Sequence, residues 1–446
     1  MIKRKKFFSH SIFLCYTIGM LDINLIRSNP KWVQEQLAKR GCQVDFAPVI
    51  ALDSTRRNLI QRNEARRQKR NENSALIAKL KKEGKDATKQ IAEMKAIGDK
   101  IAHGDAELAK LEQKIFDTLA PLPNIPLPEV VAGGKENNKV VATFGKKPEL
   151  NFKWQDHVTL ATNLGLIDYE RGAKLSGAKT WVYTGAGALL EWALLNYFID
   201  FHIANGYKFI LPPHLLNYQS GFAAGQFPKF IDDVFMTNFD KDPKKSRFLL
   251  PTAETALLNF HRDEIIDPKQ LPIRYFSYTP CYRKEAGSYR ADERGMIRGY
   301  QFNKVEMFAY CYAEESPQLF EELVRNGQKL LEGLGLHFQT TALAAEDCSA
   351  SMAKTYDLEV YIPSMKGYKE VSSISNATDY QARRANIRTK DADGKTVLLH
   401  TLNGSGLATS RVLPAILEQY QNPDGSVNIP VALHKYMHGI TVLKKK

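Results

Sequence analysis

Residues 279–288 read TPCYRKEAGS, and after a polar loop residues 299–306 read GYQFNKVE. Both segments have the composition of strands, in which side chains two positions apart share a face. The Arg and Glu of the R-x-E in the first segment therefore point the same way. In the second segment Phe302, Lys304 and Glu306 share a face, and Phe302 and Glu306 lie about 13 Å apart at the usual rise per residue. The two segments predict a β-hairpin with a row of functional groups on one face.

The separation of the Phe302 ring from the Glu306 carboxylate suits a ligand with a stackable base at one end and an ammonium group at the other. An aminoacyl-adenylate has that shape. An ordinary hairpin with surface charges explains an isolated R-x-E equally well. The function therefore depends on what the rest of the chain contributes.

The segments around this hairpin predict an α+β domain in which a mostly antiparallel sheet is flanked by helices. A helix is expected over 189–205, ending at Gly206. No G-x-G-x-x-G follows a strand and no G-x-x-x-x-G-K-[ST] occurs, which argues against Rossmann and P-loop nucleotide sites. The expected strands cover 208–211, 272–282, 297–312, 358–362, 368–374 and 397–403.

Upstream, residues 52–119 are charged and nearly free of aromatics, and predict an antiparallel two-helix coiled-coil arm. Residues 82–86 form the predicted turn, and helices of about 30 residues would be roughly 45 Å long. Such an arm serves either as a spacer for assembly or as an RNA contact. The second helix carries a heptad seam of Met94, Ile97, Ile101, Gly104, Leu108, Leu111 and Ile115. The first has a weaker seam of Leu52, Leu59, Leu76 and Leu80, which Arg66 and Asn73 interrupt.

The proline-rich stretch 121–128 marks a domain boundary. We therefore expect an N-terminal domain over 20–122 and a second domain over 123–446. Residues 1–19 imitate a secretory signal, with a basic start and an apolar stretch, but no A-x-A cleavage site follows. They are interpreted as an upstream extension, with a targeting segment as the alternative, and the true start is either Met1 or Met20.

Composition narrows the partners and the compartment. A net charge of +13 favours a polyanion, since cations near phosphates release condensed counterions; nucleic acid is the leading partner, and charge alone fits a membrane surface nearly as well. No run approaches the ~20 apolar residues that a membrane-spanning helix needs. Cysteines occur singly, which predicts a reducing cytoplasm and no structural zinc. They are Cys15, Cys42, Cys281, Cys311 and Cys348.

Five blocks, in order and at sensible spacing from about Met20 to the C-terminus, resemble seryl-tRNA synthetases, class II aminoacyl-tRNA synthetases of the bacterial type. The R-x-E hairpin resembles motif 2 of that class. Motif 1, which builds the dimer interface in this class, resembles the helix before Gly206 and the strand ending at Pro212-Pro213. The other three blocks are PTAE at 251–254, EVSSISN at 370–376 with QARR at 381–384, and the motif 3 segment LNGSGLATSR at 402–411.

The resemblance implies roles for individual residues. Arg283 would contact the α-phosphate of ATP, Arg411 the γ-phosphate, and Phe302 would stack on adenine; Glu285 would hold the adenine end or order the motif. These two arginines and Glu285 are the expected catalytic residues. The full expected ATP set is Arg283, Lys284, Glu285, Phe302, Glu370, Val371, Ser372, Ser373 and Arg411, with Glu370 and Ser373 also binding Mg²⁺. The expected L-serine set is Thr252, Ala253, Glu254, Glu306 and Ser405.

The resemblance thus implies ATP-dependent ligation of L-serine to tRNA(Ser) through a seryl-adenylate, by a cytoplasmic homodimer whose arm grips the tRNA. Serylation of tRNA(Sec) stays open. Two alternatives are a ligase that loads amino acids onto carrier proteins and a non-catalytic synthetase-like RNA-binding protein. Local departures from the family's wording are Tyr300, Ile374, Ser410 and Pro414, the last inside the expected motif 3 helix, where it would remove a hydrogen bond.

Overall fold

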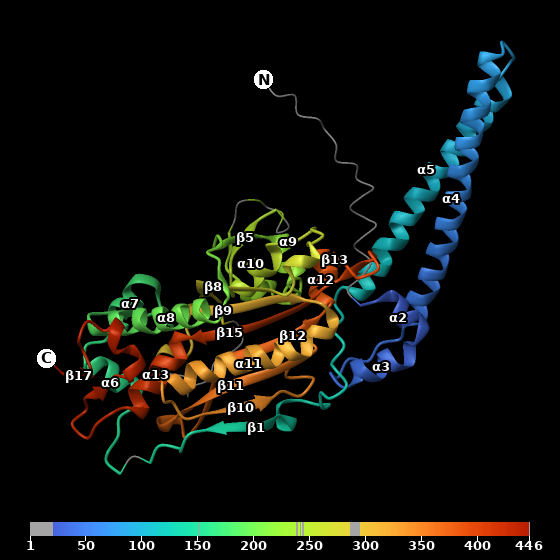
Figure 1. Ribbon diagram of the computed structural model, residues 1–446. Helices are drawn as coiled ribbons and strands as arrows, with labels where there is room; N and C mark the ends of the chain where they lie inside the picture. Colours follow the sequence, from blue (N-terminus) through green and yellow to red (C-terminus); the bar gives the residue numbers. More distant parts are fainter. Residues whose placement is uncertain are drawn as a thin grey trace, which may run out of the picture. The chain divides into compact units, whose positions relative to one another are not determined.

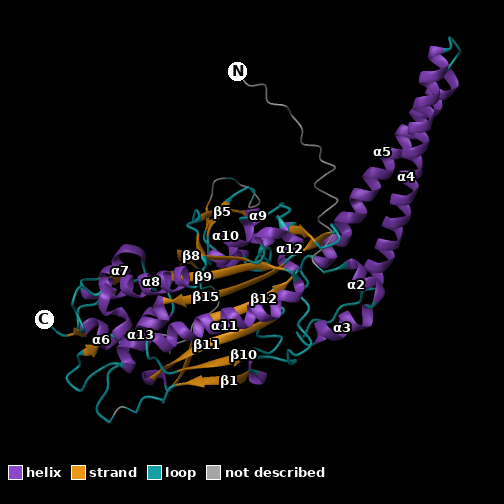
Figure 2. Cartoon of the chain, in the orientation of Figure 1, coloured by secondary structure: helices purple, strands orange, loops and turns teal. Residues whose placement is uncertain are grey.

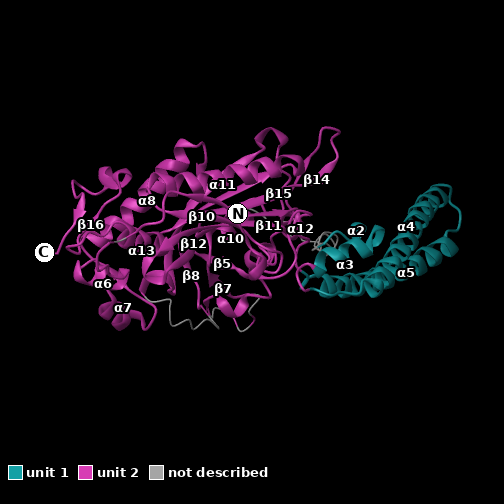
Figure 3. Ribbon diagram, turned by 90° about the horizontal axis from the view of Figure 1, so that it is seen from below, with its two compact units in different colours: residues 1–38, 42–122 teal, residues 39–41, 123–446 magenta. Residues whose placement is uncertain are grey.

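The computed structural model describes residues 21–149, 151–237, 240, 242, 245–285 and 295–445. The chain divides into two compact units, one of residues 1–38 and 42–122 and the other of residues 39–41 and 123–446 (Figure 3). The expected extension, residues 1–19, lies outside the described residues. Across the described part, no helix has both the length and the apolar character needed to cross a membrane.

The first unit is helical. Two short helices, α2 (Ile23–Ser28) and α3 (Pro30–Ala38), precede the long pair α4 (Ala47–Lys82) and α5 (Thr88–Leu119). The long helices have 36 and 32 residues, which corresponds to about 54 and 48 Å. They run side by side in opposite directions, joined by a short turn where one was predicted (Figure 1). The predicted two-helix arm is therefore confirmed, and both helices exceed the expected length.

The seam of the arm is more polar than predicted. In α5, Ile101, Gly104 and Ile115 are buried as expected. In α4 the placement of Leu76 was wrong: its side chain is 42% exposed, and Ile77 is buried instead. Asn63, two heptads before Ile77, is also buried, so Leu76 falls one position, or about 100° of helix rotation, off this seam.

The second unit is built on an eight-stranded sheet (Figures 1 and 2). Its strands, in spatial order, are β1 (Lys139–Phe144), β10 (Phe338–Ala342), β11 (Lys354–Ile362), β12 (Gly367–Thr378), β15 (His400–Ala408), β9 (Gln301–Cys311), β8 (Ile273–Tyr282) and β4 (Lys208–Phe209). Every neighbouring pair is antiparallel except β4 and β8, which are parallel. The predicted α+β architecture is confirmed.

Alternation along β9 assigns its side chains to different environments. Val305, Met307 and Ala309 join the large core formed with helices α8 (Ala186–Ala204), α11 (Ser316–Gly333) and α13 (Thr409–Gln419). On the other face, Phe308 and Tyr310 pack against α9 (Tyr218–Ala223), α10 (Ala253–Asn259) and α12 (Tyr380–Ala385). That second layer leaves the Phe302, Lys304 and Glu306 positions beside an open cavity.

Several expected bounds shift. β15 starts later than the expected 397–403, because residues 397–398 belong to the separate strand β14 (Thr396–Leu398), which pairs with β13 (Arg388–Lys390), and it ends later, because the motif 3 segment through Ala408 stays extended. β9 starts at Gln301, since residues 295–297 form a 3₁₀ turn. The helix α13 continues through Pro414. The remaining elements are α6 (His157–Asn163), β2 (Ile167–Asp168), α7 (Tyr169–Ser176), β3 (Val182–Tyr183), β5 (Leu215–Asn217), β6 (Met236–Thr237), β7 (Arg247–Leu249), β16 (Val427–Asn428) and β17 (Val442–Leu443).

Candidate active site

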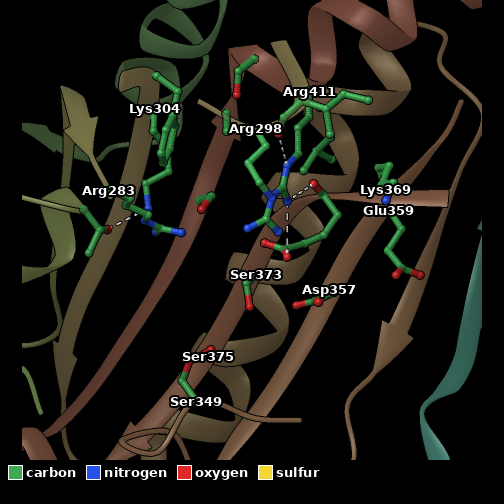
Figure 4. Close-up of a pocket in the computed structure, with 18 of the residues that line it drawn as sticks. Arg283, Arg298, Lys304, Ser349, Asp357, Glu359, Lys369, Ser373, Ser375 and Arg411 are labelled. Atoms are coloured by element: carbon green, nitrogen blue, oxygen red, sulfur yellow. Dashed lines mark hydrogen bonds and ion pairs between the residues drawn. The ribbon is translucent and has the colours of Figure 1, made fainter. Parts of the chain in front are cut away.

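A cavity of about 450 Å³ opens on the face of the sheet that the second helical layer leaves uncovered. Figure 4 shows Arg283 and Lys304 on one side of it and Arg298 and Arg411 on the other, with Ser373 and Asp357 below the second pair in this view. Eleven of the predicted site residues line this cavity. They are Thr252, Glu254, Arg283, Glu285, Phe302, Glu306, Glu370, Val371, Ser373, Ser405 and Arg411.

Three predicted site residues are not among those that line the cavity. Ala253 is buried at the start of α10. The backbone N–H of Lys284 donates to the carbonyl of Asp233 at 2.9 Å. Ser372 is buried on β12 and its hydroxyl donates to the carbonyl of Ser405 at 2.6 Å. Because successive side chains of a strand point to opposite faces, Ser372 faces away from the cavity that its neighbours Val371 and Ser373 line.

One end of the cavity is built around the carboxylate of Glu306, which is only 1% exposed. The ammonium of Lys304 lies 2.5 Å from Glu306 Oε2 and donates to Thr252 Oγ1 at 2.7 Å. From β15, Asn403 Nδ2 donates to Glu306 Oε1 at 3.2 Å, and Ser405 Oγ donates to Oε2 at 3.4 Å. Asn403 Oδ1 is buried and has no hydrogen-bond partner among the described residues. An acceptor for an incoming polar ligand is therefore present.

A second carboxylate, that of Glu254, lies at the same end on the first turn of α10. Burial, followed by the negative charge of Glu306, raises the pKa of Glu254 to about 7. A hydrogen bond from Gln381 and the charges of Lys304 and Arg283 oppose this rise. This end of the cavity thus combines two carboxylates with one ammonium, a set suited to a small zwitterion that carries a hydroxyl.

Guanidinium groups and an aromatic ring, rather than carboxylates, define the part of the cavity where β8 ends. The Arg283 guanidinium lies over the Phe302 ring, 5.3 Å from its centroid, and Arg283 Nε donates to the Pro251 carbonyl at 3.2 Å. Glu285 has φ = +52° and its carboxylate hydrogen-bonds Arg298. A planar aromatic surface beside fixed guanidinium groups suits a purine base linked to phosphates.

Arg411, in the first turn of α13, donates to the Glu370 carbonyl at 2.7 Å and lies 3.5 Å from the Glu370 carboxylate. Asp357 on β11 is directly opposite Ser373 on β12. Burial, followed by the charge of Glu370, raises the pKa of Asp357 well above its ordinary value. Its Oδ1 has no hydrogen-bond partner within the described residues. The far end of the cavity therefore combines the Arg411 guanidinium with oxygen atoms of Glu370 and Asp357 that could bind a cation.

The sequence did not assign roles to several residues that line this cavity, among them Arg298, Lys304, Asp357 and Asn403, or to Gln381, which hydrogen-bonds Glu254. Lys304 stood in the quoted hairpin, and its parity with Phe302 and Glu306 was the available signal. Asp357 and Gln381 come from segments distant in sequence, so only the fold brings Asp357 to the cavity and Gln381 to Glu254.

Comparisons with known proteins match both units. The description "Seryl-tRNA synthetase N-terminal domain" matches residues 20–126, and "tRNA synthetase class II core domain (G, H, P, S and T)" matches residues 235–420. The chain is 54% identical over 420 residues to Serine--tRNA ligase 2 of Clostridium acetobutylicum, covering 94% of this chain and 99% of that protein.

Two solved structures are similar over nearly the whole chain. Seryl-tRNA synthetase from Pyrococcus horikoshii, complexed with ATP, has a TM-score of 0.86 at 33% identity, covering 96% of this chain and 100% of that one. Cytoplasmic serine-tRNA ligase from Naegleria fowleri, in complex with AMP, has a TM-score of 0.83 at 26% identity, with coverages of 96% and 99%.

Proposed function

The chain belongs to the seryl-tRNA synthetase family and ligates serine to tRNA, and we propose that the cavity on β9, β15 and β12 is where ATP activates the serine. The observation that carries this proposal is the polarity of the cavity. Glu254 and Glu306 lie at one end beside the Lys304 ammonium, and the guanidinium groups of Arg283 and Arg411 lie along the rest, where Glu370 and Asp357 add carboxylates at the far end. We infer from this arrangement that serine binds at the Glu254 and Glu306 end and that ATP binds along the rest of the cavity.

The first step requires no base from the protein. The α-carboxylate of serine is ionised at neutral pH. It attacks the α-phosphorus, a new C–O–P bond forms, and the bond to pyrophosphate breaks. We assign Arg283 to the α-phosphate, Arg411 to the γ-phosphate and Phe302 to adenine. Fixed guanidinium groups stabilise the charge that develops on the phosphoryl oxygens without reorganising. The 3′-hydroxyl of the terminal adenosine of tRNA then attacks the seryl carbonyl, and AMP leaves.

Serine recognition is assigned to the buried end of the cavity. Glu254 and Glu306 can hold the ammonium group and accept the hydroxyl proton, while Thr252 and Ser405 complete the pocket. Ala253 follows Thr252 and precedes Glu254 in the chain, at the start of α10. Alanine would leave such buried acceptors without a partner, and sites of this type discriminate strongly against a missing hydroxyl.

Mg²⁺ is expected to accompany ATP, and the donor set at the far end fits it. Glu370 offers a carboxylate, Ser373 a hydroxyl, and Asp357 Oδ1 is a buried oxygen with no hydrogen-bond partner among the described residues. Mg²⁺ prefers oxygen ligands. We assign Glu370 and Ser373 as the residues that would hold the ion, with Asp357 beside them. The ion, when bound, neutralises phosphate charge.

The arm is assigned to tRNA. Exposed cations along α4, such as Arg62, Lys69 and Arg70, can bind phosphates, which position an RNA without reading its sequence. The arm also favours this function over a carrier-protein ligase, which lacks it. A non-catalytic RNA-binding protein is disfavoured, since Arg283, Glu306 and Arg411 are all retained. We propose tRNA(Ser) as the substrate, and tRNA(Sec) as a further candidate that charging of both transcripts can test.

The expected homodimer and compartment are also proposals. Trp192 and Ile203 on α8 and Leu211 after β4 expose 53%, 54% and 70% of their area, in the segment that resembles motif 1. Exposed apolar side chains on one segment favour a protein interface. We therefore propose a homodimer, and because the cysteines occur singly, which favours a reducing compartment, we propose that it is cytoplasmic. Light scattering on a sizing column should give about twice the 50.4 kDa chain mass.

Serine-dependent ATP–pyrophosphate exchange, followed by charging of tRNA(Ser), tests the proposal. Wild-type protein should catalyse exchange, and Arg283→Ala should reduce it by at least 100-fold. Deleting residues 52–119 should spare exchange and abolish charging. Absence of exchange above the Arg283→Ala control would refute the assigned site. Loss of exchange together with charging in the deletion would refute the division of labour between the units.

A further inference from the structure

Gln381 on α12 is fully buried, and both the nitrogen and the oxygen of its side-chain amide have hydrogen-bond partners. Its Nε2 donates to Glu254 Oε1 at 2.7 Å and lies 3.3 Å from the Ala224 carbonyl oxygen. Its Oε1 accepts from the Thr401 hydroxyl at 2.8 Å. Gln381 itself is not among the residues that line the cavity. It touches the serine end only through Glu254.

These partners determine the orientation of the amide. If the amide were flipped, its carbonyl oxygen would face both the Glu254 carboxylate and the Ala224 carbonyl, and its NH₂ group would face Thr401. Two acceptors would then oppose the amide oxygen in a buried site, which is costly. Gln381 therefore presents an N–H to Glu254, and the helix α12 and strand β15 together hold it there.

We propose that Gln381 is a positioning residue for serine binding: it orients the Glu254 carboxylate, favours its ionised form, and leaves its second oxygen for the substrate ammonium group. The inference rests on the proposed function, in which Glu254 contacts serine. A hydrogen-bond donor to a carboxylate stabilises the charged form. Without that donor, Glu254 would both lose its fixed direction and take up a proton more readily.

Opposing charges surround Glu254, so the hydrogen bond from Gln381 affects how readily Glu254 ionises. Glu306 on β9 opposes ionisation, whereas Lys304 on β9 and Arg283 at the end of β8 favour it. Because the pKa of Glu254 is about 7, its ionised fraction changes steeply around neutral pH. Removing the Gln381 hydrogen bond shifts this pKa upward. The acid limb of kcat/KM for serine should therefore move to higher pH.

The direct test substitutes Gln381→Met and measures ATP–pyrophosphate exchange with serine and ATP varied separately. KM for serine should rise roughly 10- to 100-fold, the range for one hydrogen bond to a charged group, while KM for ATP stays within twofold. Gln421→Met is the matched control, because Gln421 is another buried amide whose bonds run to Gln155 and Glu418. It should leave both KM values unchanged. Equal rises in both KM values for Gln381→Met, or no rise at all, would overturn the inference.

Gln381→Glu keeps the side-chain shape and provides a second test if the Met variant fails to fold. Its carboxyl group can donate to Glu254 only while protonated. kcat/KM for serine should therefore decline as pH rises from 6 to 8, opposite to the wild-type trend. A profile parallel to that of the wild type would overturn the inference.

A double substitution separates this inference from the proposed function. Glu254→Gln alone should raise KM for serine, and adding Gln381→Met should change KM by less than twofold, because Gln381 acts through Glu254. If Glu254→Gln leaves KM for serine unchanged, the proposed serine contact itself is wrong. If Glu254→Gln raises KM and Gln381→Met does not, only the positioning role is wrong.

Discussion

Lys304 is the most informative residue to remove, because its ammonium group lies between two assigned serine contacts. The exposed fraction of its side chain is 8% and that of its partner Glu306 is 1%. Lys304→Met keeps the aliphatic length and removes the charge. Glu306 then stays buried beside Glu254, with only Asn403 and Ser405 as donors.

Removing one partner of a buried ion pair costs about 3–5 kcal/mol, since the remaining charge is uncompensated. We expect the lower end, about 3 kcal/mol, because the Asn403 and Ser405 hydrogen bonds to Glu306 survive. The Glu306 carboxylate also loses the ammonium group that holds it in place, so it no longer presents a fixed acceptor to the substrate. kcat/KM for serine should therefore fall by at least 100-fold, with a smaller change in KM for ATP.

Fluorescence-monitored urea unfolding measures the stability change, and pyrophosphate exchange measures the activity. The matched control is Lys435→Met, which removes an ion pair to Asp200 whose side chains are 65% and 53% exposed. Exposed pairs contribute little, so this control should unfold at the wild-type urea concentration and keep full activity. A Lys304→Met protein with wild-type stability and wild-type serine kinetics would refute the reasoning.

Three further predictions follow from other parts of the fold. Gly104→Ala should reduce tRNA charging several-fold and spare exchange, because an added Cβ would lie 2.3 Å from Asn63 Oδ1 on the facing helix. The control Gly98→Ala, where an added Cβ would meet no atom within 4 Å, should reduce neither charging nor exchange. Equal loss of charging in the two variants would contradict the packing argument. Burial lowers the pKa of His202 to about 3 from 6.5. The stability that the neutral imidazole contributes is therefore complete above pH 6.5. It is lost as pH falls toward 3, because the unfolded chain binds a proton there and the folded chain does not. Urea unfolding at pH 7 and pH 5 should therefore show a pH-dependent loss larger by about 2 kcal/mol in wild type than in His202→Leu, and equal losses would disprove this. Phe302→Ala should raise KM for ATP about tenfold with KM for serine within twofold, which the same exchange assay measures, and a selective rise in KM for serine would reverse the proposed orientation.

The sequence predicted the hairpin and the sheet class because strand alternation is local. Arg283, Phe302 and Glu306 lie within one hairpin, so parity was enough to place two of them along one face. The same rule put Lys304 beside them, although no role was assigned to it. Ser372 shows the limit of motif matching: it belongs to a matched block, yet strand alternation turns its hydroxyl to the Ser405 carbonyl.

Other features depend on pairings between distant segments. Asp357 meets Ser373 only through the β11–β12 register, which contains a bulge next to Glu359. Gln381 reaches Glu254 across 127 positions in the chain. On the arm, the spacing of leucines selected Leu76, whereas the actual seam accepts the polar Asn63 because Gly104 leaves room for it on the facing helix.

Direct detection of enzyme-bound seryl-adenylate tests the central claim. Protein in excess over α-labelled ATP, with serine and without tRNA, is quenched in acid and the labelled products are separated. We predict that wild-type protein forms seryl-adenylate with serine, that alanine gives at least 100-fold less, and that Glu306→Gln and Arg283→Ala form it at least 100-fold more slowly than the wild type. Adenylate formed equally well with alanine, or formed at the wild-type level by Glu306→Gln, would contradict the assignment of this cavity to serine activation.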